Sequence, residues 1–211
     1  QLADRLGALG VGTDSRIVLY DDSAIKSAAR AWFILHLFGH DRVAVLDGGW
    51  AKWHSEGRPV ESGSVAPEEV VYEARPERPI VRTKKDMLAN LDSGVEQVVD
   101  ARDADRFTGA SIDTVHDLPG GHIPGARNQF FRDLFREDGT YRPIPELREA
   151  VKKAGIEPDR PIVASCGSGM TASVVLFALH LIGRDDTALY DGSWAEWGTD
   201  ADTPKELGTA S

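Results

Sequence analysis

The stretch of sequence that decides the fold occurs twice. It reads Leu35-His-Leu-Phe-Gly-His-Asp-Arg-Val-Ala-Val-Leu-Asp-Gly-Gly-Trp-Ala-Lys-Trp53, and 144 residues later Leu179-His-Leu-Ile-Gly-Arg-Asp-Asp-Thr-Ala-Leu-Tyr-Asp-Gly-Ser-Trp-Ala-Glu-Trp197, with eleven of nineteen aligned positions identical. Upstream, Ile17 matches Ile162 at an offset of 145, so the first copy has one more residue in the loop after its apolar strand. A repeat of this length indicates the duplication of a whole domain rather than a short-period solenoid.

Each copy carries the same predicted elements: helix, strand, loop, helix, strand and short helix. In the second copy we expect helices at 145–154 and 171–182, strands at 161–165 and 187–190, and a short helix at 193–197. A further strand is expected at 95–100, after a helix that Thr83 caps. Short apolar strands that alternate with helices predict parallel sheets covered on both faces, and therefore an α/β fold.

The two copies differ in completeness. We expect residues 1–60 to form a partial domain without a cysteine, residues 61–80 to form a proline-rich linker, and residues 81–211 to form a complete domain. The first copy has only nine residues before Gly10, whereas a long stretch from Thr83 onward precedes the equivalent Gly155. The sequence therefore predicts a first domain that is incomplete at its N-terminus, in a natural chain longer by about 60–80 residues.

Composition excludes several classes of protein. The 211 residues include 24 Lys and Arg against 34 Asp and Glu, which gives a net charge of −10 and argues against a nucleic-acid or membrane-surface partner. The single cysteine excludes an intrachain disulfide. The uncharged stretch 162–182 contains Ser-Cys-Gly-Ser-Gly and is not a continuous apolar span. We expect a cytoplasmic protein.

That cysteine, Cys166, is the main candidate for chemistry. It ends an apolar strand and opens a Gly-rich loop before a helix, and ligands of open α/β sheets bind at the carboxyl ends of the strands. Gly167 and Gly169 allow the loop to turn its N–H groups toward an anion, and the helix N-terminus adds partial positive charge. A thiol in this setting is expected to react as the thiolate. The alternative is a buried structural cysteine.

Four motifs resemble the tandem-rhodanese sulfurtransferases: Asp100-Ala-Arg102, Gly121-His-Ile-Pro-Gly-Ala126, Cys166-Gly-Ser-Gly-Met-Thr-Ala172 and Tyr190-Asp-Gly-Ser-Trp-Ala-Glu-Trp197. The resemblance implies two rhodanese-like domains, each a parallel sheet flanked by helices, with Asp21 or Asp22 replacing the cysteine in the first. It implies that Cys166 carries a sulfane sulfur as a persulfide from 3-mercaptopyruvate or thiosulfate to cyanide or a thiol, such as a thioredoxin-like protein. This covalent chemistry requires no metal or other cofactor.

The resemblance also assigns residues to the site. Ser168 stands where a family serine assists the cysteine, and the donor is expected to contact the loop residues Gly167, Gly169, Met170 and Thr171. The neutral loop favours 3-mercaptopyruvate over thiosulfate. Arg106 matches the family arginine that holds the donor anion, although an ion pair with Asp103 or Asp105 is the alternative. The family's second arginine is missing from residues 110–121, where His116 is the nearest substitute. Arg102 and His122 are expected to be structural.

Two other functions are alternatives to sulfur transfer for a chain with this cysteine loop. A cysteine phosphatase needs an arginine six positions after the cysteine, where this chain has Ala172. A non-catalytic rhodanese-like sulfur or redox sensor, or an interaction module, stays open. The intact Cys166 loop argues against that alternative, and the incomplete first domain argues for it.

Overall fold

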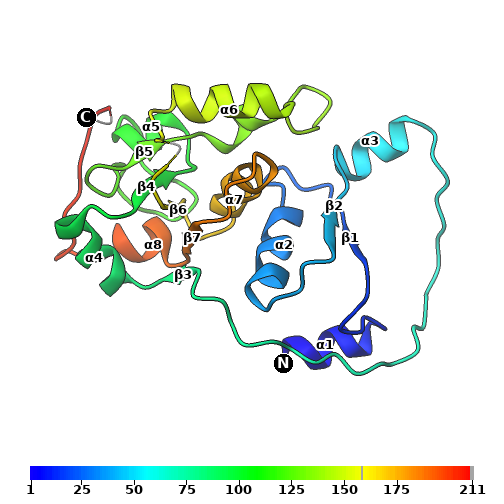
Figure 1. Ribbon diagram of the computed structural model, residues 1–211. Helices are drawn as coiled ribbons and strands as arrows, with labels where there is room; N and C mark the ends of the chain where they lie inside the picture. The colour runs from blue at the N-terminus through cyan, green and yellow to red at the C-terminus, as the bar shows by residue number, and fades with distance from the viewer. Residues whose placement is uncertain (158, 210–211) are drawn as a thin grey trace.

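The chain folds into two α/β units that pack against each other (Figure 1). The computed structural model describes residues 1–157 and 159–209. The first unit contains α1 (Leu2–Ala8), β1 (Ile17–Leu19), α2 (Ala28–Leu37), β2 (Val43–Val45) and α3 (Gly49–Ser55). Its two strands pair in parallel, with Ile17 opposite Val43.

The second unit is built on a five-stranded parallel sheet in the order β3-β7-β6-β4-β5. Its elements are β3 (Val81–Arg82), α4 (Lys84–Ser93), β4 (Gln97–Asp100), α5 (Ala104–Thr108), β5 (Arg127–Asn128), the 3₁₀ helix η1 (Phe131–Leu134), α6 (Ile144–Lys153), β6 (Ile162–Ser165), α7 (Ala172–Leu181), β7 (Thr187–Tyr190) and α8 (Ser193–Trp197). The strands β4 and β6 are buried along their whole length. The sequence prediction of an α/β fold with parallel sheets is confirmed.

The observed boundaries differ from the expected ones by one or two residues, for local reasons. The strand β6 begins at Ile162 because the preceding Pro161 has no N–H to donate. The strand β4 begins at Gln97, since Val95 lies outside the sheet and is exposed. Thr83 caps α4 as expected, with its side chain accepting a hydrogen bond from the Asp86 N–H.

The helices α2 and α7 join the two units. Trp32 of α2 is buried and packs edge-on against Phe177 of α7, with 5.0 Å between the ring centroids. Ala29 and Phe33 belong to the same hydrophobic core as the buried residues of α7. The two copies of the repeat therefore share one core.

The segment from Glu56 to Ile80 contains no helix or strand and crosses from α3 past α1 to β3 (Figure 1). It packs along the first unit. The Val70 N–H donates to the Gly7 carbonyl (3.1 Å), and the buried Tyr72 hydroxyl lies 3.2 Å from His40 Nδ1. The predicted linker is thus attached to the surface of the first copy.

The uncharged stretch 162–182 is divided among β6, a loop and α7. Eight of the ten residues of α7 are buried, which explains why its sequence shows no polar face. In residues 1–157 and 159–209, no helix has both the length and the apolar character that a membrane crossing requires.

Candidate active site

Cys166 follows the last residue of β6 and is buried, with 1% of its surface exposed. The loop after it leads into α7, which begins at Ala172 with no side-chain cap. Gly169 has φ +75°, a conformation that residues with a Cβ rarely adopt. The cysteine therefore lies at the carboxyl end of a central strand, beside an uncapped helix N-terminus.

Ser193 fixes this loop from the side. Its hydroxyl accepts hydrogen bonds from the N–H groups of Cys166 and Gly169, both at 3.1 Å, and donates to the Tyr190 carbonyl at 2.8 Å. Ser193 itself is fully buried and has φ +51°. Two of the loop N–H groups that were expected to face an anion therefore donate to the Ser193 hydroxyl instead.

Four other N–H groups of the loop have no partner within residues 1–157 and 159–209. They belong to Gly167, Ser168, Met170 and Thr171, and none forms a hydrogen bond to a described residue. The loop carbonyls, in contrast, are used: those of Cys166 and Gly167 accept from Trp194 and Ala195, both at 2.9 Å. The loop can therefore bind a negative charge through its N–H groups while its carbonyls hold it in place.

The predicted loop side chains have different surroundings. Ser168 is exposed, and its hydroxyl forms no hydrogen bond to a described residue. Met170 and Thr171 are half-buried. Gly167 lies under the imidazole of His116: a Cβ at this position would be 2.8 Å from Nδ1 and 2.9 Å from Nε2. Glycine at 167 thus allows His116 to cover the loop.

Asp113, which the sequence analysis did not single out, connects His116 to the arginines. It is fully buried, and one carboxylate oxygen lies 3.1 Å from His116 Nδ1. The other lies 3.4 Å from Arg106 Nη1. Burial raises the pKa of Asp113, but the contact with His116 and the charge of Arg106 outweigh it and hold the pKa below its ordinary value. Asp113 is therefore a buried carboxylate ion.

Arg106 lies beside two carboxylates of the site, those of Asp103 and Asp113. Its Nε donates to Asp103 at 2.6 Å, which is one of the ion pairs named as the alternative. Its Nη1 faces Asp113, while Nη2 forms no hydrogen bond to a described residue. The side chain of Arg106 is 20% exposed. One edge of Arg106 is thus held in place and the rest can accept an anion.

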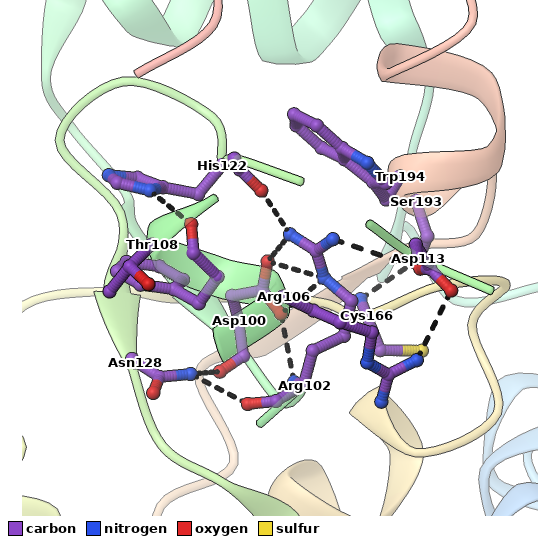
Figure 2. A network of polar contacts seen from close by, with 12 residues as sticks. Asp100, Arg102, Arg106, Thr108, Asp113, His122, Asn128, Cys166, Ser193 and Trp194 are labelled. Atoms are coloured by element: carbon purple, nitrogen blue, oxygen red, sulfur yellow. Dashed lines mark hydrogen bonds and ion pairs between the residues drawn. The ribbon is translucent and has the colours of Figure 1, made fainter. Parts of the chain in front are cut away.

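Arg102 is structural, as expected. It is 1% exposed and binds Asp100 through Nε and Nη2, and Nη2 also donates to the Gly121 carbonyl at 2.6 Å. Its guanidinium lies over the ring of Trp194, 4.6 Å from the centroid. Figure 2 shows Arg102 within this network, with Asp100, Asp113 and Trp194 around it. His122 is also buried, with Nδ1 2.8 Å from the Phe107 carbonyl.

The first unit also reaches the cysteine loop. Arg30 at the start of α2 forms an ion pair with Asp191 at 2.7 Å. A Cβ on Gly169 would lie 2.5 Å from the Asp191 carboxylate and 3.3 Å from the Arg30 guanidinium. This pair, which links the two copies against the loop, was not predicted: Asp191 stands in the Tyr190–Trp197 motif, but Arg30 stands in none, and the contact joins segments that are far apart in the sequence.

Comparison with known proteins places these features in a family. The model of the rhodanese-like domain matches residues 1–56 and 83–200. Thiosulfate sulfurtransferase of Gallus gallus is 38% identical over 92% of this chain and 68% of its own length. 3-mercaptopyruvate sulfurtransferase of Mus musculus is also 38% identical, over 92% of this chain and 66% of its own length. Thiosulfate/3-mercaptopyruvate sulfurtransferase 1, mitochondrial, of Arabidopsis thaliana is 36% identical over 94% of this chain. The chain spans about two thirds of the length of the chicken and mouse relatives.

Solved structures agree with this placement. SseA of Escherichia coli, described with the rhodanese fold and the catalytic mechanism of 3-mercaptopyruvate sulfotransferases, has a TM-score of 0.80 at 37% identity, over 92% of this chain and 72% of its own. EanB, solved with a cysteine persulfide and ergothioneine, has a TM-score of 0.86 at 27% identity, over 98% of this chain and 55% of its own. The resemblance found in four short motifs thus extends over nearly the whole chain, which belongs to the rhodanese-like sulfurtransferase family.

Proposed function

We propose that this protein is a sulfurtransferase that moves a sulfane sulfur from 3-mercaptopyruvate, or from thiosulfate, through a persulfide on Cys166 to cyanide or a thiol. The observation that carries the proposal is the position of Cys166 at the end of β6, next to loop N–H groups that have no partner among the described residues. The names of the chicken and mouse relatives support both donors. The persulfide in EanB supports the intermediate.

The chemistry follows from a soft nucleophile and a leaving group that can carry an electron pair. With thiosulfate, the Cys166 thiolate attacks the outer sulfur, the S–S bond breaks, and sulfite leaves with the bonding pair. With 3-mercaptopyruvate, the C–S bond breaks and the pair goes to carbon, which gives the enolate of pyruvate and then, with a proton, pyruvate. Attack of the acceptor on the outer sulfur of the persulfide returns the Cys166 thiolate.

The other site residues serve donor binding and positioning in this proposal. Arg106 and His116 hold the anionic end of the donor. The N–H groups of the loop around Gly167, Met170 and Thr171 stabilise the negative charge on the persulfide. Ser168, exposed and unbonded in the structure, assists at the cysteine when the donor is bound.

Intact-mass measurement after donor treatment tests the proposal. The parent protein should gain one sulfur atom, which cyanide then removes, and Cys166→Ser should gain none because a serine hydroxyl forms no persulfide. Ser62→Ala, which removes an exposed serine hydroxyl outside the loop, is the control and should still acquire the sulfur. Sulfur transfer that persists in Cys166→Ser would contradict the mechanism.

The burial of Cys166 favours the second candidate function, a non-catalytic sulfur or redox sensor or an interaction module. In that case the protein would show no turnover of sulfur from a donor to cyanide or a thiol. The proposal includes a thioredoxin-like protein as a thiol acceptor and a cytoplasmic location. It also divides the chain into domains at residues 1–60 and 81–211. For the location, fractionation of the source cells is the relevant test, since one relative is named as mitochondrial.

A further inference from the structure

The polar network beside the cysteine loop has an imbalance of charge. Three carboxylates, those of Asp100, Asp103 and Asp113, are linked by hydrogen bonds and ion pairs to two guanidiniums, those of Arg102 and Arg106. With a neutral imidazole at His116, the network carries one excess negative charge. A protonated His116 balances it.

Asp113 is the carboxylate of this network that lies farthest from the guanidiniums. Asp100 is bound by two nitrogens of Arg102, the nearer at 2.7 Å, and Asp103 lies 2.6 Å from Arg106. Asp113 is farther from both guanidiniums, at 3.8 Å from Arg102 and 3.4 Å from Arg106. The buried Nη1 of Arg102 that faces it forms no hydrogen bond to a described residue. The side-chain contact nearest to Asp113 is His116 Nδ1, at 3.1 Å.

His116 lies between this carboxylate and the cysteine loop. The Asp113 carboxylate accepts a hydrogen bond from Nδ1–H, and the ring lies against Gly167, the residue after Cys166. Among the described residues, Asp113 contacts the imidazole directly, and Arg106 on α5 and Arg102 after β4 both face Asp113. The ring also lies against the loop that carries Cys166. An anion placed beside Arg106 would add negative charge to a network that already has an excess, unless His116 takes up a proton.

We propose, on the basis of the function proposed above, that donor binding is coupled to protonation of His116, with Asp113 as the positioning residue that holds the imidazole over the cysteine loop. A donor anion then binds most tightly when His116 is an imidazolium. The affinity for the donor decreases as the pH rises through the ionisation of this histidine, by up to about tenfold per pH unit for a single linked proton.

Thiosulfate is the suitable probe, because it stays a dianion from pH 6 to pH 9. The measurement is the thiosulfate concentration that gives half-maximal persulfide formation on Cys166, followed by mass after rapid quenching. In the parent protein this concentration should rise with pH. In His116→Gln it should be high and independent of pH, and in His116→Arg low and independent of pH. Asp113→Asn, which removes the excess charge, should weaken the pH dependence. Melting curves confirm that each variant is folded.

A binding experiment separates this inference from the proposed function. Calorimetric titration of Cys166→Ser with thiosulfate in two buffers of different ionisation enthalpy should show proton uptake, and Cys166→Ser/His116→Gln should show none. Proton-linked binding without persulfide formation in the parent would contradict the proposed function and support the anion site. Persulfide formation whose pH dependence is the same in the parent and in His116→Gln would overturn the inference.

Discussion

The loops after β1 and β6 occupy equivalent places in the two copies, and only the second has a nucleophile. The carbonyls of Asp21 and Cys166 accept the same hydrogen bond, from the N–H of Trp50 and Trp194, both at 2.9 Å. Asp21, rather than Asp22, is therefore the counterpart of Cys166. The loop residue added in the first copy lies after this point.

The two loops differ in whether a side chain accepts hydrogen bonds from the first N–H groups of the following helix, α2 or α7. The Asp21 carboxylate accepts hydrogen bonds from Ser23 N–H (3.1 Å), from the Ser27 hydroxyl (3.3 Å) and from the first N–H of α2, at Ala28. In the second copy no side chain caps α7. The first copy has thus filled its anion-binding position with its own carboxylate, and the second has left that position open beside a thiol.

A second difference stands at the start of the short helices. Gly49 and Ser193 are equivalent and have similar φ angles, +58° and +51°. A Cβ on Gly49 would collide with the Asp21 carbonyl, so glycine is required in the first copy. In the second copy Ser193 adopts the same unfavourable backbone conformation, and the hydrogen bonds of its hydroxyl to the cysteine loop offset the cost.

Moving the cysteine to the first copy should produce the largest effect. We expect Cys166→Ser/Asp21→Cys to show no sulfur transfer, because Arg106, Asp113 and His116 lie beside the second loop only. Replacing Asp21 also leaves the first N–H groups of α2 without their acceptor. The measurement is donor-dependent formation of thiocyanate from cyanide, with Asp21→Asn as the matched control that keeps Cys166. Activity in the double variant would show that a strand end and a helix N-terminus are sufficient.

The second largest effect is expected from a substitution in the hydrophobic core that the two copies share. Trp32→Ala should lower the free energy of unfolding by about 3–5 kcal/mol, the usual cost of removing a large buried aromatic side chain. Because Trp32 packs between the copies, against Phe177 and His180, both units should unfold in one transition at lower denaturant. Trp53→Ala, at a half-buried tryptophan of the first copy, is the control and should cost less. Separate transitions in the parent protein would contradict the single core.

Much of the difference between the two copies could be predicted from the sequence, because it depends on patterns that extend over only a few residues. The repeat, the strand β6 and the turn at Cys166 follow from apolar runs and glycines that act over a few residues. Even the pairing of Asp21 or Asp22 with Cys166 was available, and the structure only decided between the two. The family's motifs lie in these same local segments.

The site residues that the sequence did not predict are held by contacts between distant segments of the chain. Asp113 stands in a stretch of mixed polar and apolar residues without periodicity, and nothing in its neighbours indicates burial between Arg102 and Arg106. The contact of Arg30 with Asp191 joins the two copies. Ser193 did have a signal, since serine replaces Gly49 in an otherwise identical Asp-Gly-x-Trp-Ala motif. A residue that differs within a repeat can mark a specialised site as clearly as one that is retained.

Ser193 allows the comparison of short helices to be tested. Ser193→Ala leaves two buried N–H groups without an acceptor and should lower the free energy of unfolding by about 1–3 kcal/mol. Ser193→Gly loses the same hydrogen bonds but relieves the left-handed backbone, so it should be the more stable variant by about 1 kcal/mol. Chemical denaturation of the two variants measures the difference. An alanine variant as stable as the parent would show that the hydroxyl does not hold the loop.

The smallest expected effect concerns the pair of equivalent histidines at the far ends of α2 and α7. His36 contacts Arg78 at 2.6 Å and Asp41 at 3.3 Å, whereas His180 contacts Asp185 alone among the described carboxylates and guanidiniums. Burial, and after it the charge of Arg78, lowers the pKa of His36 below its ordinary value of 6.5, against the opposing effect of Asp41.

The sign of the resulting pH dependence follows from this shift. Since the unfolded chain binds the proton of His36 more readily than the folded chain, stability is complete above about pH 6.5 and decreases as the pH falls toward the folded pKa. We expect the free energy of unfolding to fall between pH 7 and pH 5 in the parent and to fall less in His36→Gln, by an amount smaller than the Ser193 effect. The exposed His54→Gln is the control and should follow the parent. Equal pH dependence in the parent and in His36→Gln would mean that Asp41 compensates fully, and that the two histidines of the repeat are electrostatically equivalent despite Arg78.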